Sequence, residues 1–255
     1  MKVDIRTAAA RFYDLNPDFP EDIPFYQKMI PSPAASILEL GCGTGRVTIP
    51  LAGSCSYIHG IDRSSSMIAL CQEKLENAKI PRSRAHVAEG DITDFDLGRT
   101  FDFIIAPFRV LQNIETNMQV ASLMRCIRKH LAPGGTCVLN VFRPFYAPHE
   151  LRERWTRLEE QLSWEVPIRG GKVACFDRRP RVDEDNFILF PELIYRRFEG
   201  ERLAEEAVLK LVMRCYDPET FEEMIRKHGF KVLQKWGGYA AESYGEGPEL
   251  VIQFT

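Results

Sequence analysis

The sequence predicts an α/β protein built on a doubly wound sheet of mainly parallel strands, with a small antiparallel β insertion. Apolar, strand-like runs alternate with helix-like segments over residues 34–142, which is typical of a parallel sheet covered by helices on both faces. After residue 142 the alternation stops, and strand-like runs separated by turn residues indicate an antiparallel meander over residues 143–216. A chain of 255 residues with 45% hydrophobic residues suits one domain with such an insertion.

Residues 1–33 should form a helical lead-in that contains two aromatic groups, Phe12-Tyr13-Asp14 and Phe25-Tyr26. The first residues carry alternating charges and no long apolar run, unlike a signal peptide, and no stretch of the chain approaches membrane-spanning length. The seven cysteines are scattered without a C-x-x-C pair that would suggest zinc. We expect them to be small, buried, unpaired side chains of a protein in a reducing compartment. We therefore expect a cytoplasmic protein without a bound metal.

The most informative segment follows the first apolar run and reads Glu39-Leu40-Gly41-Cys42-Gly43-Thr44-Gly45. It predicts a buried strand, a tight glycine turn and the start of a helix. Glycine tolerates positive φ and lets a ligand approach the backbone closely. The G-x-G-x-G spacing differs from that of dinucleotide-binding and phosphate-binding loops. A carboxylate at Glu39 would repel a pyrophosphate and would favour the cationic end of a ligand.

Two later strands end near acidic residues. The run over residues 57–62 ends in Asp62, about one helix-length after the glycine turn, where an acid can bind ribose hydroxyls. Met67 lies on the buried stripe of the helix that follows. Residues 85–92 are predicted to be a third strand and a polar turn that contains Asp91.

A fourth strand is expected over Phe101–Phe108, running out into a loop. The next helix has its apolar positions at Val120, Leu123, Met124, Ile127 and Leu131. It should stop at Ala132-Pro133-Gly134-Gly135, which is a strong helix-ending signal. Thr136–Phe142 is then predicted to be the fifth core strand.

In this order, the five motifs resemble those of the class I S-adenosylmethionine-dependent methyltransferases. The resemblance covers residues 35–142 and is closest to small prokaryotic members of largely unassigned substrate. These carry D-I-P-F-Y before the glycine motif and A-P-F after the fourth strand, here Asp22–Tyr26 and Ala106–Phe108. The resemblance implies a Rossmann-like sheet of seven strands with the last strand antiparallel. It also implies S-adenosylmethionine as the cofactor and S-adenosylhomocysteine as its product. The positions implied to contact the cofactor are Glu39, Gly41, Cys42, Gly43, Asp62, Arg63, Met67, Gly90, Asp91, Ile92 and Ala106.

Residues 143–164 are ambiguous, although four apolar residues in them fit a helix, and antiparallel strands should follow. The helix-like spacing is that of Leu151, Trp155, Leu158 and Leu162, and the strands are expected at 172–176, 187–198 and 203–216. Residues 217–255 should supply the last helix and a strand pair that complete the core sheet, because Asp217-Pro218-Glu219 is a strong helix start. The insertion is expected to serve as a lid, as part of the substrate site or as a dimer surface.

The methyl acceptor should be bound between the lead-in, the loop after the fourth strand and the insertion. The substrate-side candidates are Tyr13, Phe108, Arg109, Gln112 and Tyr146, with Arg143 and Tyr216 beside them. Relatives usually carry a small polar residue where Arg109 stands, so an Arg109 that faces the cavity would favour an acidic group on the substrate. His149 is the one histidine worth testing as a base. Because an amine acceptor needs no base whereas a phenol or carbon nucleophile usually does, N-, O- and C-methylation all stay open.

We therefore expect a methyltransferase that acts on a small molecule, without a nucleic-acid or membrane partner, and a homodimer formed through the insertion. The alternatives are a regulatory protein that binds the cofactor without catalysis, and a methyltransferase of nucleic acid or protein. The net charge of −3 argues against nucleic acid. Arg178, Arg179 and Arg181 form a local basic cluster, but acids at residues 183–185 follow directly, which favours a solvated hairpin.

Overall fold

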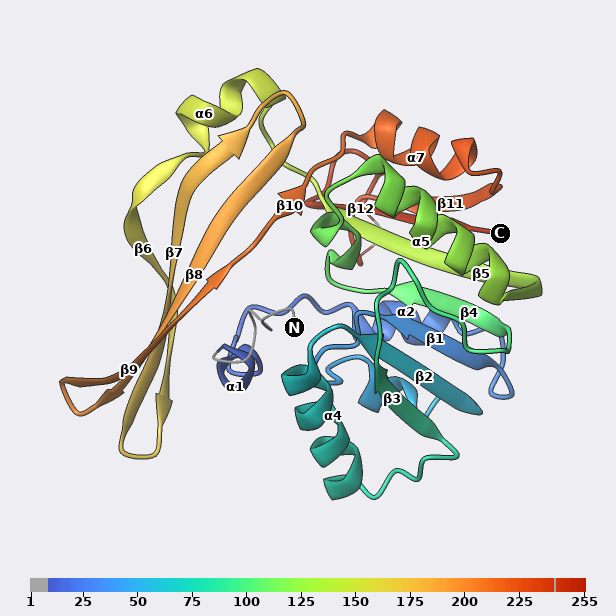
Figure 1. Ribbon diagram of the computed structural model, residues 1–255, viewed down its shortest axis with the longest axis horizontal. Helices are drawn as coiled ribbons and strands as arrows, with labels where there is room; N and C mark the ends of the chain where they lie inside the picture. The colour runs from blue at the N-terminus through green and yellow to red at the C-terminus, as the bar shows by residue number, and fades with distance from the viewer. Residues whose placement is uncertain (1–8, 241) are drawn as a thin grey trace.

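The computed structural model describes residues 9–240 and 242–255, which form a helix-covered core sheet and a second, antiparallel sheet beside it (Figure 1). Residues 1–8 of the expected lead-in lie outside the described residues. None of the described helices is both long enough and apolar enough to cross a membrane.

The core sheet has seven strands in the order β11-β12-β5-β4-β1-β2-β3. They are β1 (Ser36–Leu40), β2 (Tyr57–Asp62), β3 (Ala85–Glu89), β4 (Phe101–Ala106), β5 (Leu131–Phe142), β11 (Val232–Trp236) and β12 (Glu249–Phe254). β1 to β5 pair in parallel, and β12 lies antiparallel between β5 and β11. This topology confirms the seven-stranded sheet with an antiparallel last strand.

Helices cover both faces of the core sheet. α5 (Asn117–His130) and α7 (Pro218–Lys227) pack on one face, and α2 (Ile23–Met29), α3 (Thr48–Leu51) and α4 (Ser65–Asn77) pack on the other. Neighbouring residues of β1 show the division, since Ile37 and Leu38 are both fully buried but belong to different apolar clusters. Strands that are apolar on both faces are expected in a sheet that is covered twice.

The second sheet is formed by the insertion. Its strands are β6 (Arg157–Ile168), β7 (Gly171–Asp183), β8 (Ile188–Glu199), β9 (Arg202–Lys210) and β10 (Met213–Arg214), in the order β10-β8-β7-β6 with β9 also paired to β8. The short helix α1 (Ala10–Tyr13) packs on one face of this sheet, where the rings of Phe12 and Tyr195 lie 5.7 Å apart. The remaining short helices are η1 (Val110–Asn113), η2 (Pro148–Glu150) and α6 (Leu151–Arg154).

The structure resolves the ambiguous segment after residue 142 as a short helix followed by a strand, so the helix-like spacing of its four apolar residues holds only for the first turn. Leu151 and Trp155 are buried, as predicted, but α6 ends at Arg154 and β6 begins at Arg157. Leu158 and Leu162 are 67% and 51% exposed. Pairing with the long strand β7 satisfies the backbone here, so tertiary context overrides the helical spacing.

Candidate active site

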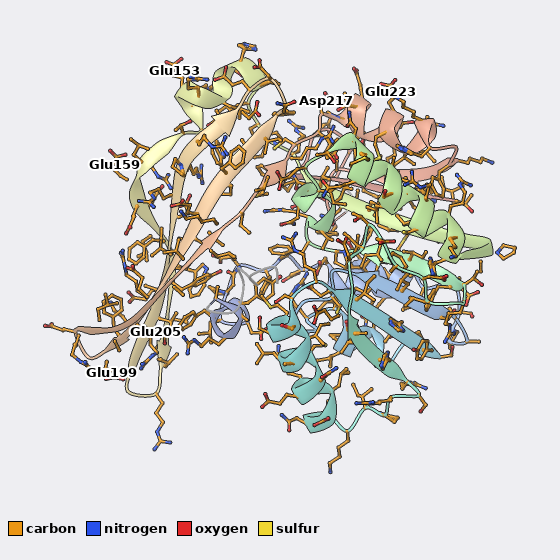
Figure 2. All side chains as sticks on the ribbon, viewed as in Figure 1. Glu153, Glu159, Glu199, Glu205, Asp217 and Glu223 are labelled. Atoms are coloured by element: carbon orange, nitrogen blue, oxygen red, sulfur yellow. The ribbon has the colours of Figure 1, made fainter. Side chains whose placement is uncertain are left out.

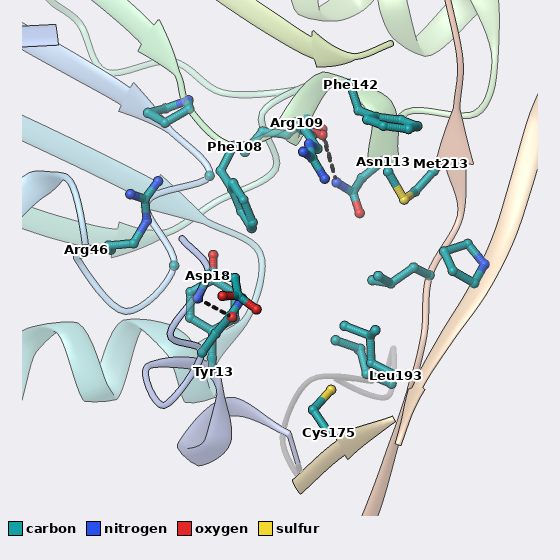
Figure 3. A pocket seen from close by; sticks show the side chains of 18 of the residues that line it. Tyr13, Asp18, Arg46, Phe108, Arg109, Asn113, Phe142, Cys175, Leu193 and Met213 are labelled. Atoms are coloured by element: carbon teal, nitrogen blue, oxygen red, sulfur yellow. Dashed lines mark hydrogen bonds between the residues drawn. The ribbon is translucent and has the colours of Figure 1, made fainter. Parts of the chain in front are cut away.

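A cavity of about 490 Å³ lies between the carboxyl ends of the core strands and the inner face of the insertion sheet (Figure 3). Its residues come from four parts of the chain: the segment after α1, the glycine turn, the loop after β4 and the strands of the insertion. In open α/β sheets, ligands bind at the carboxyl ends of the strands. The cavity therefore lies where a ligand site is expected, between the two sheets.

The glycine turn forms one wall of this cavity. Gly41, Gly43 and Gly45 all have positive φ, at 70°, 54° and 84°, a conformation that costs other residues energy. A Cβ atom at Gly41 would meet Val110 Cγ2 at 2.5 Å, whereas one at Gly43 would have no neighbour within 4 Å. The turn is thus packed against protein at Gly41 and open at Gly43. The helix expected after it is only four residues long, so the turn itself holds the geometry.

Glu39 is a buried acid at the end of β1 that also lines the cavity. Thr48 donates a hydrogen bond to its Oε2 over 2.5 Å. Burial raises the pKa of Glu39 to about 8, because the charged carboxylate is poorly solvated there. Without a cationic partner in the cavity, Glu39 is therefore mostly protonated at neutral pH.

Asp62 holds the turn in place from the end of β2. Its Oδ2 accepts a hydrogen bond from the N–H of Gly43 over 3.0 Å, and its Oδ1 accepts one from the N–H of Ser64 over 2.9 Å. The carboxylate is 3% exposed and borders the cavity. Each oxygen keeps a second acceptor site, so Asp62 both fixes the turn and can bind a hydroxyl group.

A buried ion pair and an aromatic cluster support the same wall. Arg46 donates from Nη1 and Nη2 to the two carboxylate oxygens of Asp22 over 2.6 and 2.8 Å. Its guanidinium carbon also lies 4.9 Å from the ring of Phe19 and 5.4 Å from that of Phe108. Tyr13 extends this cluster, with its ring 5.1 Å from Phe19. The pair thus ties the lead-in to the glycine turn.

The loop after β4 enters the cavity in a strained conformation. Phe108 and Arg109 both have left-handed backbones, with φ of 53° and 68°, which costs non-glycine residues energy and is often seen at functional sites. Arg109 donates from Nε and Nη2 to Oε1 of the buried Glu249, and Asn140 donates to Oε2 of the same carboxylate. Arg109 therefore faces the cavity with its charge already balanced.

The opposite wall is the inner face of the insertion sheet. Its lining is mainly apolar: Trp155, Trp164, Cys175, Leu189, Pro191, Leu193, Tyr195, Leu209, Leu211 and Met213. Three polar residues interrupt it, namely Ser163, Asp177 and Arg179. In the described part of the chain, no histidine borders the cavity, and no group of three or more His, Cys, Asp or Glu side chains could hold a metal.

Only some of the residues expected at the site line the cavity. Of the cofactor positions, Glu39, Gly41, Cys42, Gly43, Asp62 and Met67 line it, while Arg63, Gly90, Asp91, Ile92 and Ala106 lie outside its lining at the ends of β2, β3 and β4. Of the acceptor candidates, Tyr13, Phe108 and Arg109 line it, while Gln112, Arg143, Tyr146, His149 and Tyr216 do not.

The structure explains why Gln112 does not line the cavity. Its side chain is fully buried, accepts from the N–H of Phe142 over 2.7 Å and donates to the carbonyl of Arg214 over 3.0 Å. It therefore joins the core to the insertion. Tyr146 packs in the apolar cluster around Trp155 but does not itself line the cavity.

Sequence reasoning missed the cavity residues of the insertion and the ion pair beneath the glycine turn. Asp22 was visible only as the first letter of D-I-P-F-Y, and nothing local linked it to Arg46, which lies 24 residues later. The acids that follow Arg179 in the sequence predict a solvated hairpin for it. The hairpin exists, with β7 ending at Asp183 and β8 starting at Ile188, but Arg179 points to the face that borders the cavity.

Comparisons with known proteins agree with this architecture. Residues 37–135 match the family model of a methyltransferase domain. The dTDP-3-amino-3,4,6-trideoxy-alpha-D-glucopyranose N,N-dimethyltransferase of Streptomyces venezuelae is 25% identical over 142 residues, which are 56% of this chain and 53% of that protein. The alignment thus spans about half the length of that relative.

Two solved structures have the same fold over nearly the whole chain. An S-adenosylmethionine-dependent methyltransferase from Clostridium acetobutylicum superimposes with a TM-score of 0.79 at 16% identity, covering 97% of both chains. The CcbJ methyltransferase from Streptomyces caelestis gives 0.77 at 21% identity, covering 98% of this chain and 97% of that one. At these identities the comparison concerns the fold, insertion included.

Proposed function

We propose that this chain, which has the fold and the domain of the class I S-adenosylmethionine-dependent methyltransferases, transfers a methyl group from S-adenosylmethionine to a small-molecule acceptor. The observation that carries the proposal is the cavity, which joins the glycine turn, Glu39 and Asp62 to an apolar wall of the insertion. One side suits a cofactor with hydroxyl and cationic groups, and the other side suits a separate small molecule.

The residues of the turn fit the cofactor. The open space at Gly43 leaves its backbone accessible to a ligand, and the carboxyl of Glu39 can bind a cationic group such as the ammonium of the methionine part. Asp62 can accept from ribose hydroxyls. The polar turn around Asp91 is our proposed adenine contact, with Gly90, Ile92 and Ala106 beside it and Arg63 at the ribose end.

We infer that the acceptor nucleophile is an amine nitrogen. When bound, the cofactor supplies a methyl group on a positively charged sulfur, and the protein supplies orientation and exclusion of water. A neutral amine attacks through its own lone pair and needs no base, which agrees with a cavity lining that contains no histidine among the described residues. The Streptomyces venezuelae relative is named as an N,N-dimethyltransferase.

The other parts of the proposal follow from charge and cysteine chemistry. The net charge of −3 argues against a nucleic-acid partner, and Glu199 and Glu205 of the insertion (Figure 2) pair with arginines of the same sheet. All seven cysteines are free, which supports a reducing compartment such as the cytoplasm.

Cofactor binding should depend on pH through Glu39. Because its pKa in the folded protein is about 8, binding a cationic group requires loss of a proton below that pH. The affinity for S-adenosylhomocysteine should rise with pH, by up to about tenfold per unit below 8, and level off above it. Without ligand, Glu39 is ionised between about pH 4.5 and 8 in the unfolded chain but stays protonated in the folded chain. The free energy of unfolding should therefore fall as the pH rises through that range.

Binding calorimetry with S-adenosylmethionine and S-adenosylhomocysteine across this pH range tests the proposed cofactor and the predicted pH dependence of its affinity. Glu39→Gln should bind more weakly and lose the pH dependence, whereas Glu115→Gln, on an exposed loop, should behave as the parent protein. Failure of the parent protein to bind either compound at millimolar concentration would contradict the proposed function. Cofactor-dependent gain of a methyl mass in pooled metabolites would then identify the acceptor.

We also propose that the insertion forms a homodimer through its outer face. Cys175, Asp177 and Leu193 point into the cavity, so their neighbours Phe176 and Ile194 point to the other face. There Leu162, Phe176, Ile194 and Val208 form a continuous cross-strand row. Ile194 is already buried within the chain (2% exposed), whereas Leu162 and Val208 at the ends of the row are 51% and 40% exposed. An apolar row of this kind favours burial against a partner.

The charges on this face favour a second copy as the partner. Arg178 of β7 lies directly opposite Glu192 of β8 and forms an ion pair with it inside one chain. A two-fold axis along the strands between β7 and β8 would place Arg178 of one copy over Glu192 of the other. The face is therefore complementary to itself, as a two-fold interface requires.

Sedimentation velocity provides the test of the dimer. The parent protein should sediment as a dimer, and Leu162→Glu should shift it to monomer while leaving S-adenosylhomocysteine binding unchanged. Leu233→Glu is the control, since Leu233 is a similarly exposed leucine (41%) on the core sheet. A monomeric parent protein, or a dimer that Leu162→Glu leaves intact, would exclude this interface.

A further inference from the structure

Arg179 is the cationic group on the otherwise apolar wall of the cavity. It lies on β7, in register with Arg157 of β6, and its guanidinium carbon is 5.5 Å from the ring of Trp155. Asp177, two residues earlier on the same face of the strand, also borders the cavity. A charge placed among tryptophan and leucine side chains loses solvation, so its partners need to be accounted for.

The arginines of the cavity differ in how many of their donors are used. Arg46 uses both Nη groups on Asp22, and Arg109 uses Nε and Nη2 on Glu249. Arg179 donates from Nε alone, to Oδ2 of Asp177 over 2.7 Å. Its two Nη groups, which carry four of its five N–H donors, make no hydrogen bond to the described residues.

The single carboxylate of Asp177 does not neutralise both of the arginines that it binds. Its Oδ1 accepts from Nη2 of Arg157 over 2.6 Å, while Oδ2 is taken by Arg179. Two guanidinium groups thus share one carboxylate, which leaves a net charge of +1. The carboxylate is only 14% exposed and Arg179 is 37% exposed. Asp177 therefore orients Arg179 through Nε while the Nη edge stays accessible.

We propose that Arg179 binds an anionic group, a carboxylate or a phosphate, on the methyl acceptor. This inference rests on the proposed function, since it assigns a substrate class to the insertion side of the same cavity. The Nη edge of an arginine presents paired donors that match two oxygens of such an anion. Apolar neighbours such as Leu189 and Met213 would hold the body of the acceptor. The acceptor would thus carry both an amine and an anion.

Two fluorescent probes of similar shape test this site. 8-Anilinonaphthalene-1-sulfonate is an apolar anion, and N-phenyl-1-naphthylamine is its uncharged counterpart. We expect Arg179→Gln to weaken binding of the anion about tenfold, corresponding to about 1.4 kcal/mol, and to change binding of the neutral probe less than twofold. Arg181→Gln is the matched control, because Arg181 lies two residues further along β7, is exposed and does not line the cavity; it should change neither probe.

Competition then distinguishes the source of the anion. Benzoate or phenyl phosphate should displace the anionic probe from the parent protein and not from Arg179→Gln, and the tighter competitor indicates whether the acceptor carries a carboxylate or a phosphate. Equal loss of both probes in Arg179→Gln, or displacement by neither competitor, would overturn the proposal. S-adenosylhomocysteine binding, measured on the same samples, should survive Arg179→Gln. Its absence in the parent protein would contradict the proposed function and would leave the anion result to stand separately.

Discussion

Gly41→Ala should weaken S-adenosylhomocysteine binding by at least about 100-fold, or about 2.7 kcal/mol. The new Cβ would lie 2.5 and 2.8 Å from the two Cγ atoms of Val110, at a φ of 70°. Val110 cannot move aside easily, because it follows two residues, Phe108 and Arg109, that are already held in left-handed backbones. The glycine turn would have to shift, and it is the turn that faces the proposed cofactor.

The same substitution should lower the free energy of unfolding by about 2–6 kcal/mol, since backbone strain and overpacking each cost about 1–3 kcal/mol. Gly98→Ala is the matched control: Gly98 has a φ of 61°, but a Cβ there would meet nothing within 4 Å, and Gly98 does not line the cavity. It should keep its affinity within twofold. A Gly41→Ala variant that binds as tightly as the parent protein would show that the turn does not contact the ligand.

Asp22→Asn should destabilise the fold by about 3–5 kcal/mol, because it leaves the partly buried charge of Arg46 without its carboxylate. Asp22 is fully buried, and Arg46 is 14% exposed. The amide that replaces one oxygen would also present N–H groups to a guanidinium that has only donors. In a domain of this size the melting temperature should fall by about 6–20 °C. Urea unfolding measures the free energy directly.

Asp96→Asn provides the comparison for this pair. Asp96 pairs with Lys129 over 2.7 Å, and both side chains are more than half exposed. Exposed pairs contribute about 0–1 kcal/mol, so this variant should unfold close to the parent protein. An Asp22→Asn variant within 1 kcal/mol of the parent would mean that Arg46 finds water or another acceptor when its partner is lost.

Much of the core could be predicted because its signals are local. The strand before Gly41, the acid at Asp62 and the end of a helix just before residues 132–135 each depend on a few neighbouring residues, although α5 already ends at His130 and β5 begins at Leu131. The helix expected near Leu158 failed for the opposite reason. Helical spacing over four apolar residues is a weak signal, and pairing with β7 outweighed it.

The sequence by itself determined the order of the core elements, the glycine turn and the acids beside it, since these follow from local conformation and strand periodicity. Only the tertiary structure decided which side chains meet. Arg109 and Glu249 are 140 residues apart, and Asp22 and Arg46 lie in separate elements. In the insertion, a shift of one residue in register would have turned Arg179 away from the cavity and Arg178 toward it. Register depends on all the strands of a sheet at once, so it becomes visible only in the folded chain.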